Sequence, residues 1–168
     1  MFGPFEYTSF FSVWYWVLTV TVWTQVCHRT LGVPYDMILR AGRLPEGAAD
    51  VEAMTRIAAA RITAIHNAAG TLLAGLLGFV LAALAVFGFV SGIEPARAGF
   101  ILVLPLSVVL LCTVRLALYI DRTGVTGAEL RRRLARRRAW NQAIAITATL
   151  LAAFIALLHQ PVSLYMRL

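Results

Sequence analysis

The sequence predicts an all-α membrane protein with four transmembrane helices, and three observations lead to that prediction. Hydrophobic residues make up 60% of the 168 residues and charged residues only 14%, a balance typical of membrane proteins. Four apolar segments come close to the about 20 residues that a helix needs to cross about 30 Å of hydrocarbon. Basic residues gather in two of the loops. We therefore expect a single transmembrane domain over residues 1–168.

The four spans are expected at residues 9–27, 68–92, 98–120 and 140–158. The first span carries Trp14, Tyr15 and Trp16, and such rings favour the headgroup level of a membrane. The second span has no charged residue. A very short turn then joins it to the third span, so these two spans are expected to form an antiparallel hairpin. The third span contains Pro105 and Arg115.

The arginines predict the orientation. The loop 28–67 holds five arginines and the loop 121–139 holds seven, whereas the other side holds only Arg97 and Arg167. Loops rich in basic residues stay in the cytoplasm. Both termini are therefore expected to be periplasmic, in the inner membrane of a bacterium.

Both long loops are expected to be partly helical. Thr126 and Glu129 form the pattern of a capping box, which predicts a helix that continues directly into the fourth span. Asp50 is a good N-cap residue for a helix that lies along the membrane interface or extends the second span toward the cytoplasm. Between them, Pro34 indicates a turn at residues 31–36.

Small residues at four-residue spacing predict close helix packing. Such ridges occur in the second span (Gly70, Ala74, Gly78, Ala82, Gly88, Gly92) and in the fourth (Ala145, Thr149, Ala153, with Ala148, Ala152, Ala156). They either pack the bundle internally or dock another membrane subunit.

Polar residues concentrate at the cytoplasmic leaflet, where Gln25, His28, Arg115 and Asn141 are the candidate binding residues. Buried polar groups in hydrocarbon must find partners, so a network between helices is one interpretation. The other is a pocket for a lipid headgroup, a quinone-like ring or a haem edge. Arg115 can also extend its charge to the headgroups or bind a lipid phosphate.

The helix before the fourth span carries the candidate contact residues Arg131, Arg132, Arg133, Arg136, Arg137 and Arg138. A juxtamembrane cluster of this kind attracts anionic lipids, with about 1 kcal/mol for each arginine. It can also dock an acidic cytoplasmic protein.

Several functions are excluded or disfavoured. No catalytic motif occurs, and no Asp or Glu lies inside a span, which argues against an enzyme and against a proton-coupled transporter. His28 and His66 are expected on one side of the membrane and His159 on the other, so we expect no metal site and assign no cofactor. The basic residues flank apolar spans instead of interleaving with exposed aromatics, so nucleic acid is not an expected partner.

Two sequence segments resemble a known family. They are residues 14–16 (WYW) and 31–37 (LGVPYDM), found together with the arginine helix after the third span. The chain resembles a small inner-membrane family of alphaproteobacteria that is often labelled a component of the SufBCD iron–sulfur assembly complex. The resemblance implies a membrane companion of a soluble cytoplasmic complex.

The leading functional hypothesis is a non-enzymatic accessory or scaffold protein that presents an arginine-rich cytoplasmic face to a partner. The alternative is a membrane protein, or an accessory subunit of a membrane complex, that binds a lipid, quinone or haem in the leaflet pocket. Anionic lipids are expected partners in either case.

Overall fold

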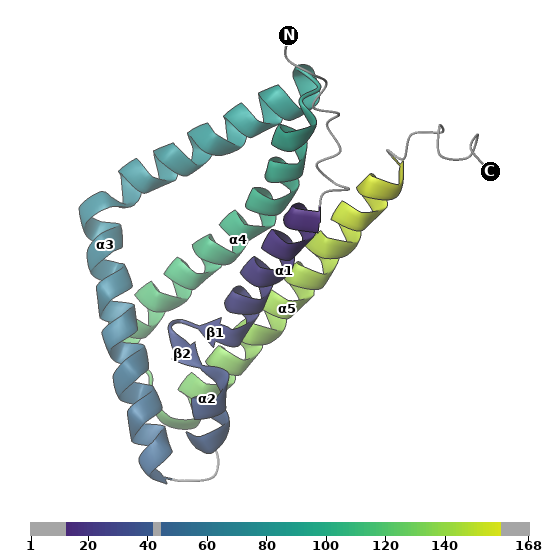
Figure 1. The fold of residues 1–168 in the computed structure, drawn as a ribbon. Helices are drawn as coiled ribbons and strands as arrows, with labels where there is room; N and C mark the ends of the chain where they lie inside the picture. Colours follow the sequence, from purple (N-terminus) through teal and green to yellow (C-terminus); the bar gives the residue numbers. More distant parts are fainter. Residues whose placement is uncertain (1–12, 42–44, 159–168) are drawn as a thin grey trace, which may run out of the picture.

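The computed structural model describes residues 13–41 and 45–158, which form helices around one small β-hairpin (Figure 1). The elements are α1 (Val13–His28), β1 (Arg29–Thr30), β2 (Val33–Pro34), α2 (Tyr35–Ala41), α3 (Pro45–Ala85), the π-helical turn η2 (Val86–Val90), α4 (Glu94–Thr123) and α5 (Gly127–Leu158). Three segments are helices long and apolar enough to cross a membrane, namely Gly47–Val90, Glu94–Thr123 and Gly127–Leu157. These match predicted spans two, three and four. The first predicted span begins outside the described residues, and its described part, α1, has 16 residues.

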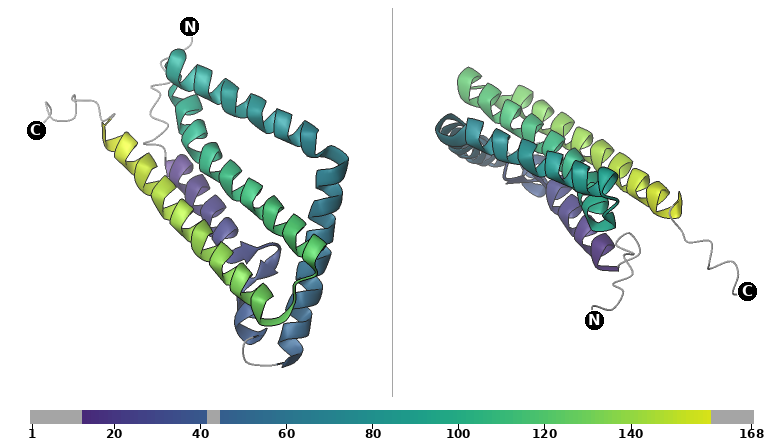
Figure 2. Two further views of the ribbon diagram at one scale, coloured as in Figure 1. Left: turned by 180° about the vertical axis from the view of Figure 1, so that it is seen from behind. Right: turned by 90° about the horizontal axis from the view of Figure 1, so that it is seen from above.

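The helices alternate in direction (Figures 1 and 2). The start of α1, the α3–α4 turn and the end of α5 lie at one end of the bundle, called here the turn end. The β-hairpin, α2 and the loop 124–126 lie at the opposite end, called the hairpin end. The two long predicted loops therefore meet at the hairpin end.

Helices α3 and α5 each continue from a loop into a predicted span. Helix α3 has 41 residues, about 60 Å at 1.5 Å per residue, which is twice the hydrocarbon thickness of about 30 Å. It begins at Pro45 rather than at Asp50, and proline suits the first position of a helix. Helix α5 likewise runs without a break from Gly127, as the arginine helix was expected to do.

Helix α3 is bent near its middle, so that it approaches α4 at both ends and stands away between them (Figures 1 and 2). Only 6% of the residues in its most apolar stretch of 18 residues are buried inside the protein. Ala74 and Gly78 are exposed, and there is open space where a Cβ on Gly78 would stand. Of the two interpretations of this ridge, internal packing is therefore wrong for Ala74 and Gly78.

The corresponding ridge on α5 does pack inside the bundle. Ala145, Ala152 and Ala156 are all buried, and they contact α1 and α4 through Trp23 and Ala98. Small side chains allow this close approach of helix backbones. Internal packing is thus confirmed for Ala145, Ala152 and Ala156 of the fourth predicted span.

The hairpin end is held by its own apolar core. The turn between β1 and β2 consists of Leu31 (φ +54°) and Gly32 (φ +78°), as a two-residue hairpin turn of the I′ type requires. Leu31 is only 4% exposed, and Val33 is fully buried. The core residues are Leu31, Val33, Ile38, Ala41, Val51, Ala59, Ala117, Ile120, Leu130 and Leu134. The segment 31–36 is therefore a turn only at its start, and β2 and α2 follow.

The turn end is closed by a contact between Gly88 and Arg97. The Arg97 guanidinium donates to the carbonyl oxygen of Gly88 from Nε at 3.2 Å and from Nη2 at 3.1 Å. A Cβ on Gly88 would stand 2.7 Å from the backbone nitrogen of Arg97. Only glycine allows the two backbones to approach in this way.

Candidate functional site

The four residues of the predicted leaflet pocket take different positions. Asn141 is 3% exposed, and its Nδ2 donates to the carbonyl oxygen of Val26 at 3.4 Å. Gln25 and His28 are exposed in the last turn of α1, and Arg115 is exposed on α4. The structure therefore brings Asn141 against α1 and leaves the other three side chains at the surface.

A narrow polar seam nevertheless lies between α1 and α5. Trp23 is 5% exposed and packs near Ala145, one turn along α5 from Asn141. Trp23 Nε1 and Asn141 Oδ1 are buried and find no hydrogen-bond partner among the described residues. Buried donors and acceptors normally have partners, so these two atoms are available to a small polar group.

The described histidines lie at the surface. His28 and His66 are both exposed, and His159 lies outside the described residues. Within residues 13–41 and 45–158, no group of three or more His, Cys, Asp or Glu side chains is placed to hold a metal ion.

The arginine helix at the start of α5 is divided between inward and outward side chains. Arg137 points inward, where its Nη2 donates to Val109 O at 2.5 Å and to Thr113 Oγ1 at 3.3 Å. Arg131 and Arg138 are half-buried. Arg137 is thus a cross-link between α5 and α4, a role that the sequence pattern did not distinguish.

Arg133 is fixed at the α4–α5 boundary. Its guanidinium lies 4.2 Å from the centre of the Tyr119 ring and forms a 2.7 Å ion pair with Glu129. Arg132 and Arg136 are exposed and, with Arg133 and Glu129, line a hollow of about 550 Å³. This hollow belongs to the outward side of the arginine helix.

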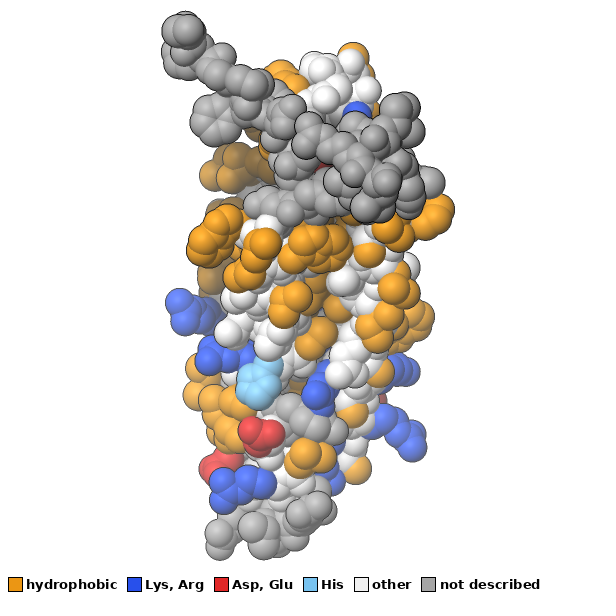
Figure 3. Space-filling model, turned by 45° about the vertical axis from the view of Figure 1, so that its right-hand side comes forward, with side chains coloured by type: hydrophobic (Ala, Val, Ile, Leu, Met, Phe, Trp, Pro, Cys, Tyr) orange, Lys and Arg blue, Asp and Glu red, His pale blue; other side chains and the backbone are white. Residues whose placement is uncertain are grey.

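The basic face of the molecule is defined by five arginines: Arg115 and Arg122 of α4 and Arg132, Arg133 and Arg136 of α5. Arg115 and Arg122 lie four residues before and three after Tyr119, which places them on its side of α4. Tyr119 in turn contacts Arg133. On the side of the molecule that Figure 3 shows, arginine side chains lie over the half nearest the hairpin end, and the coloured side chains of the other half are mostly apolar.

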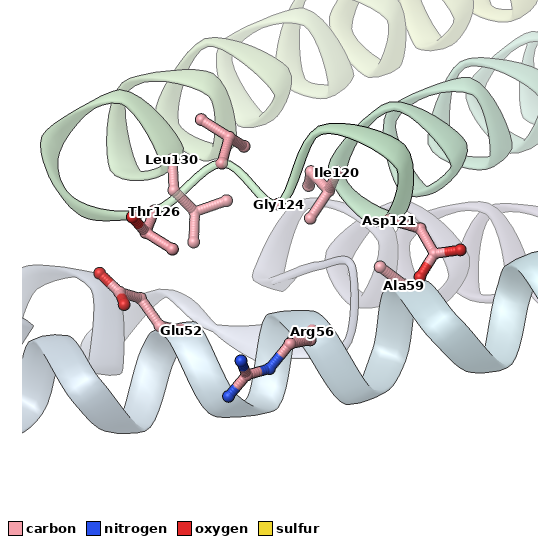
Figure 4. Close-up of a pocket in the computed structure, with 9 residues that line it drawn as sticks. Glu52, Arg56, Ala59, Ile120, Asp121, Gly124, Thr126 and Leu130 are labelled. Carbon is pink, nitrogen blue, oxygen red and sulfur yellow. The ribbon is translucent and has the colours of Figure 1, made fainter.

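A smaller cavity separates α3 from the α4–α5 loop (Figure 4). It has a volume of about 140 Å³ and is lined by Glu52, Arg56, Ala59, Ile120, Asp121, Gly124, Val125, Thr126 and Leu130. Glu52 points across the gap toward Thr126, and its Oε1 accepts from the backbone N–H of Gly127 at 2.6 Å. A carboxylate at a helix N-terminus is stabilising, so Glu52 caps α5 from a distant helix.

The predicted capping box is therefore only partly right. Helix α5 begins after Thr126 as expected, but Glu129 pairs with Arg133. The Gly127 N–H is satisfied by Glu52 instead. No local pattern could have indicated a contact between residues 75 positions apart.

Comparisons of this chain with protein-family models, with curated proteins and with solved structures find no match. The architecture itself defines the class of protein. Within the described residues it is a helical protein with three helices that are long and apolar enough to span a membrane, and arginine side chains gather toward one end of it on the side shown in Figure 3.

Proposed function

We propose that this chain is a non-enzymatic accessory or scaffold protein of a bacterial inner membrane, which presents its basic face to a cytoplasmic partner. The observation that carries the proposal is the division of the arginine helix. Arg137 ties α5 to α4, whereas Arg132 and Arg136 stay exposed. Exposed arginines on a rigid helix are suited to binding acidic groups.

The proposed topology has four spans, with both termini in the periplasm. Helix α1 packs with α4 and α5 through Trp23, Val109 and Ala145, which supports a place for α1 inside the same bundle. Its 16 described residues cover about 24 Å at 1.5 Å per residue, and the predicted span adds residues 9–12. The arginines of both long loops favour a cytoplasmic position for the hairpin end.

The proposed partner is an acidic cytoplasmic protein complex. The resemblance set out above makes the SufBCD iron–sulfur assembly complex the first partner to test. The hairpin end is stiffened by its apolar core and by the Glu52 cap. A preformed surface of this kind lowers the cost of ordering an interface on binding.

Affinity purification from the native host in mild detergent tests the proposal. We expect the partner to co-purify with the wild type and to be lost from the Arg132→Gln/Arg136→Gln double variant. The matched control is Arg40→Gln/Arg61→Gln, which removes two other exposed arginines. Recovery of only the protein and lipid from the wild type, or equal retention of the partner by both double variants, would contradict it.

A second candidate function is the binding of a quinone or haem at the α1–α5 seam. The unpartnered Trp23 Nε1 and Asn141 Oδ1 favour it, because a quinone carbonyl or haem propionate could accept from Trp23 Nε1, and the hydroxyl of a reduced quinone could donate to Asn141 Oδ1. A visible absorption spectrum of the purified protein tests for a bound haem, since a Soret band would rule out a pure scaffold.

A further inference from the structure

An open apolar groove runs between α4 and α5. Its volume is about 540 Å³, and its lining includes Leu104, Pro105, Val108, Trp140, Ala143 and Thr147. Ala143 and Thr147 are short side chains that leave space between the two helices. Because the facing α4 side chains are apolar, the groove favours a hydrocarbon occupant.

The groove leads toward the basic face. On α5, Trp140 of the groove lies four residues after Arg136 of the basic face. On α4, Val108 of the groove lies seven residues before Arg115. Residues separated by four or seven positions share one side of a helix. The same side of the α4–α5 pair is therefore apolar toward the turn end and basic toward the hairpin end.

The charges at the basic end are available for a ligand. Arg133 is already paired with Glu129, but Arg115 and Arg136 form no hydrogen bond or ion pair with any described residue. Both side chains are exposed. Guanidinium groups bind phosphate oxygens through paired hydrogen bonds, so this end favours an anion over a zwitterion.

The groove is long enough to hold an acyl chain of one leaflet. Along α5 its lining extends from Trp140 to Ile155, a rise of about 22 Å at 1.5 Å per residue. Half of a hydrocarbon core of about 30 Å is about 15 Å. Trp140 stands at the junction of the two halves, and tryptophan favours the headgroup level.

We propose that this groove is a binding site for an anionic glycerophospholipid of the leaflet at the hairpin end. One acyl chain lies between α4 and α5 along Val108 and Ala143, and the phosphate is held by Arg136 and Arg115. A free phosphate would leave the apolar half unused, and a partner helix would leave both guanidinium groups without an anion. The site shares Arg136 with the partner surface proposed above, but its test uses the purified chain without a protein partner, so the two proposals can fail separately.

Native mass spectrometry of the delipidated full chain in detergent tests the site. The probes are phosphatidylglycerol, phosphatidylcholine with the same acyl chains, and glycerol phosphate. We expect phosphatidylglycerol to bind in preference to phosphatidylcholine and to be unaffected by glycerol phosphate. Because Arg136→Gln removes a charge-assisted hydrogen bond, it should weaken phosphatidylglycerol binding about tenfold, while Arg61→Gln on α3 should leave it unchanged.

A second pair of variants tests the apolar half. Ala143→Phe fills the groove and should reduce binding of both phospholipids, whereas Ala74→Phe at an exposed position of α3 should not. Equal effects of Arg136→Gln and Arg61→Gln would overturn the proposal in favour of general charge attraction. Displacement of the lipid by glycerol phosphate would overturn it in favour of a headgroup-only site. An oligomer that Ala143→Phe dissociates, with lipid binding unchanged, would mean that a second copy occupies the groove.

Discussion

The guanidinium of Arg137 on α5 donates a hydrogen bond to the carbonyl oxygen of Val109 on α4, at 2.5 Å. Thr113 Oγ1 donates to the same carbonyl at 2.8 Å and accepts from Arg137 at 3.3 Å. Inside an apolar bundle such a charge-assisted contact is stronger than a neutral one. Arg137 therefore stabilises the contact between α4 and α5, whereas its neighbour Arg136 is exposed.

Arg137→Gln should lower the free energy of unfolding by about 1.5–3 kcal/mol, the range for a lost hydrogen bond to a charged group. Arg136→Gln is the control and should change it by less than about 0.5 kcal/mol, because this side chain is exposed. SDS titration in detergent, followed by circular dichroism, measures both values. Equal losses of unfolding free energy in the two variants would mean that the hydrogen bonds of Arg137 add no stability beyond that of an exposed arginine.

Gly88→Ala should destabilise the α3–α4 turn. The added Cβ would stand 2.7 Å from the Arg97 nitrogen, and backbone cannot move aside as a flexible side chain can. We expect a loss of about 1–3 kcal/mol, as for other overpacked positions.

The matched control is Gly78→Ala, which adds the same methyl group in open space. It should be neutral or stabilising by up to about 1 kcal/mol, since alanine favours a helix over glycine. Unfolding titrations of both variants give the comparison. A Gly88→Ala protein as stable as Gly78→Ala would contradict the close approach at the turn.

Glu52→Ala should weaken the start of α5. The Gly127 N–H would lose its acceptor, and removal of a helix cap costs about 0.5–2 kcal/mol. Hydrogen exchange of the amides at 127–130 should become faster, while amides near Val109 stay protected. Asp50→Ala, two residues away and exposed, is the control and should leave the exchange at 127–130 unchanged.

Leu31→Gly sets two effects against each other. Glycine relieves the positive φ of +54°, worth about 1–2 kcal/mol, but it removes a side chain that is 4% exposed. Truncation of a buried leucine costs about 2–5 kcal/mol, so burial outweighs strain and the variant should be less stable. A more stable variant in the same titration would show that the hairpin turn is strained without compensation.

Much of this architecture could be predicted from local patterns. Hydropathy located the three long spans, and the predicted capping box at Thr126 located the start of α5. Because no proline or glycine separates the arginine cluster from the fourth span, the sequence also predicted that one helix runs through both.

What sequence reasoning missed depends on contacts between distant residues. Arg136 and Arg137 are neighbours of the same type, and only the position of α4 makes one outward and the other inward. Glu52 meets Gly127 across 75 positions. The ridge at Ala74 and Gly78 has the spacing of a packing face, but the bend of α3 carries it away from α4. The predicted pocket of Gln25, His28, Arg115 and Asn141 rested on the assumption that side chains at the same membrane depth contact one another. In the structure three of these four side chains are exposed.

The central claim is a four-span chain with a cytoplasmic basic face, and cysteine labelling in intact cells tests it most directly. Single cysteines are introduced as Gly3→Cys, Ser91→Cys and Arg132→Cys in a background that lacks Cys27 and Cys112. With a maleimide that cannot cross the inner membrane, we predict labelling at positions 3 and 91 in cells with a permeabilised outer membrane, and at 132 only after lysis. Labelling of 132 before lysis would contradict the orientation, and protection of position 3 alongside 132 would show that the first predicted span, residues 9–27, does not cross the membrane.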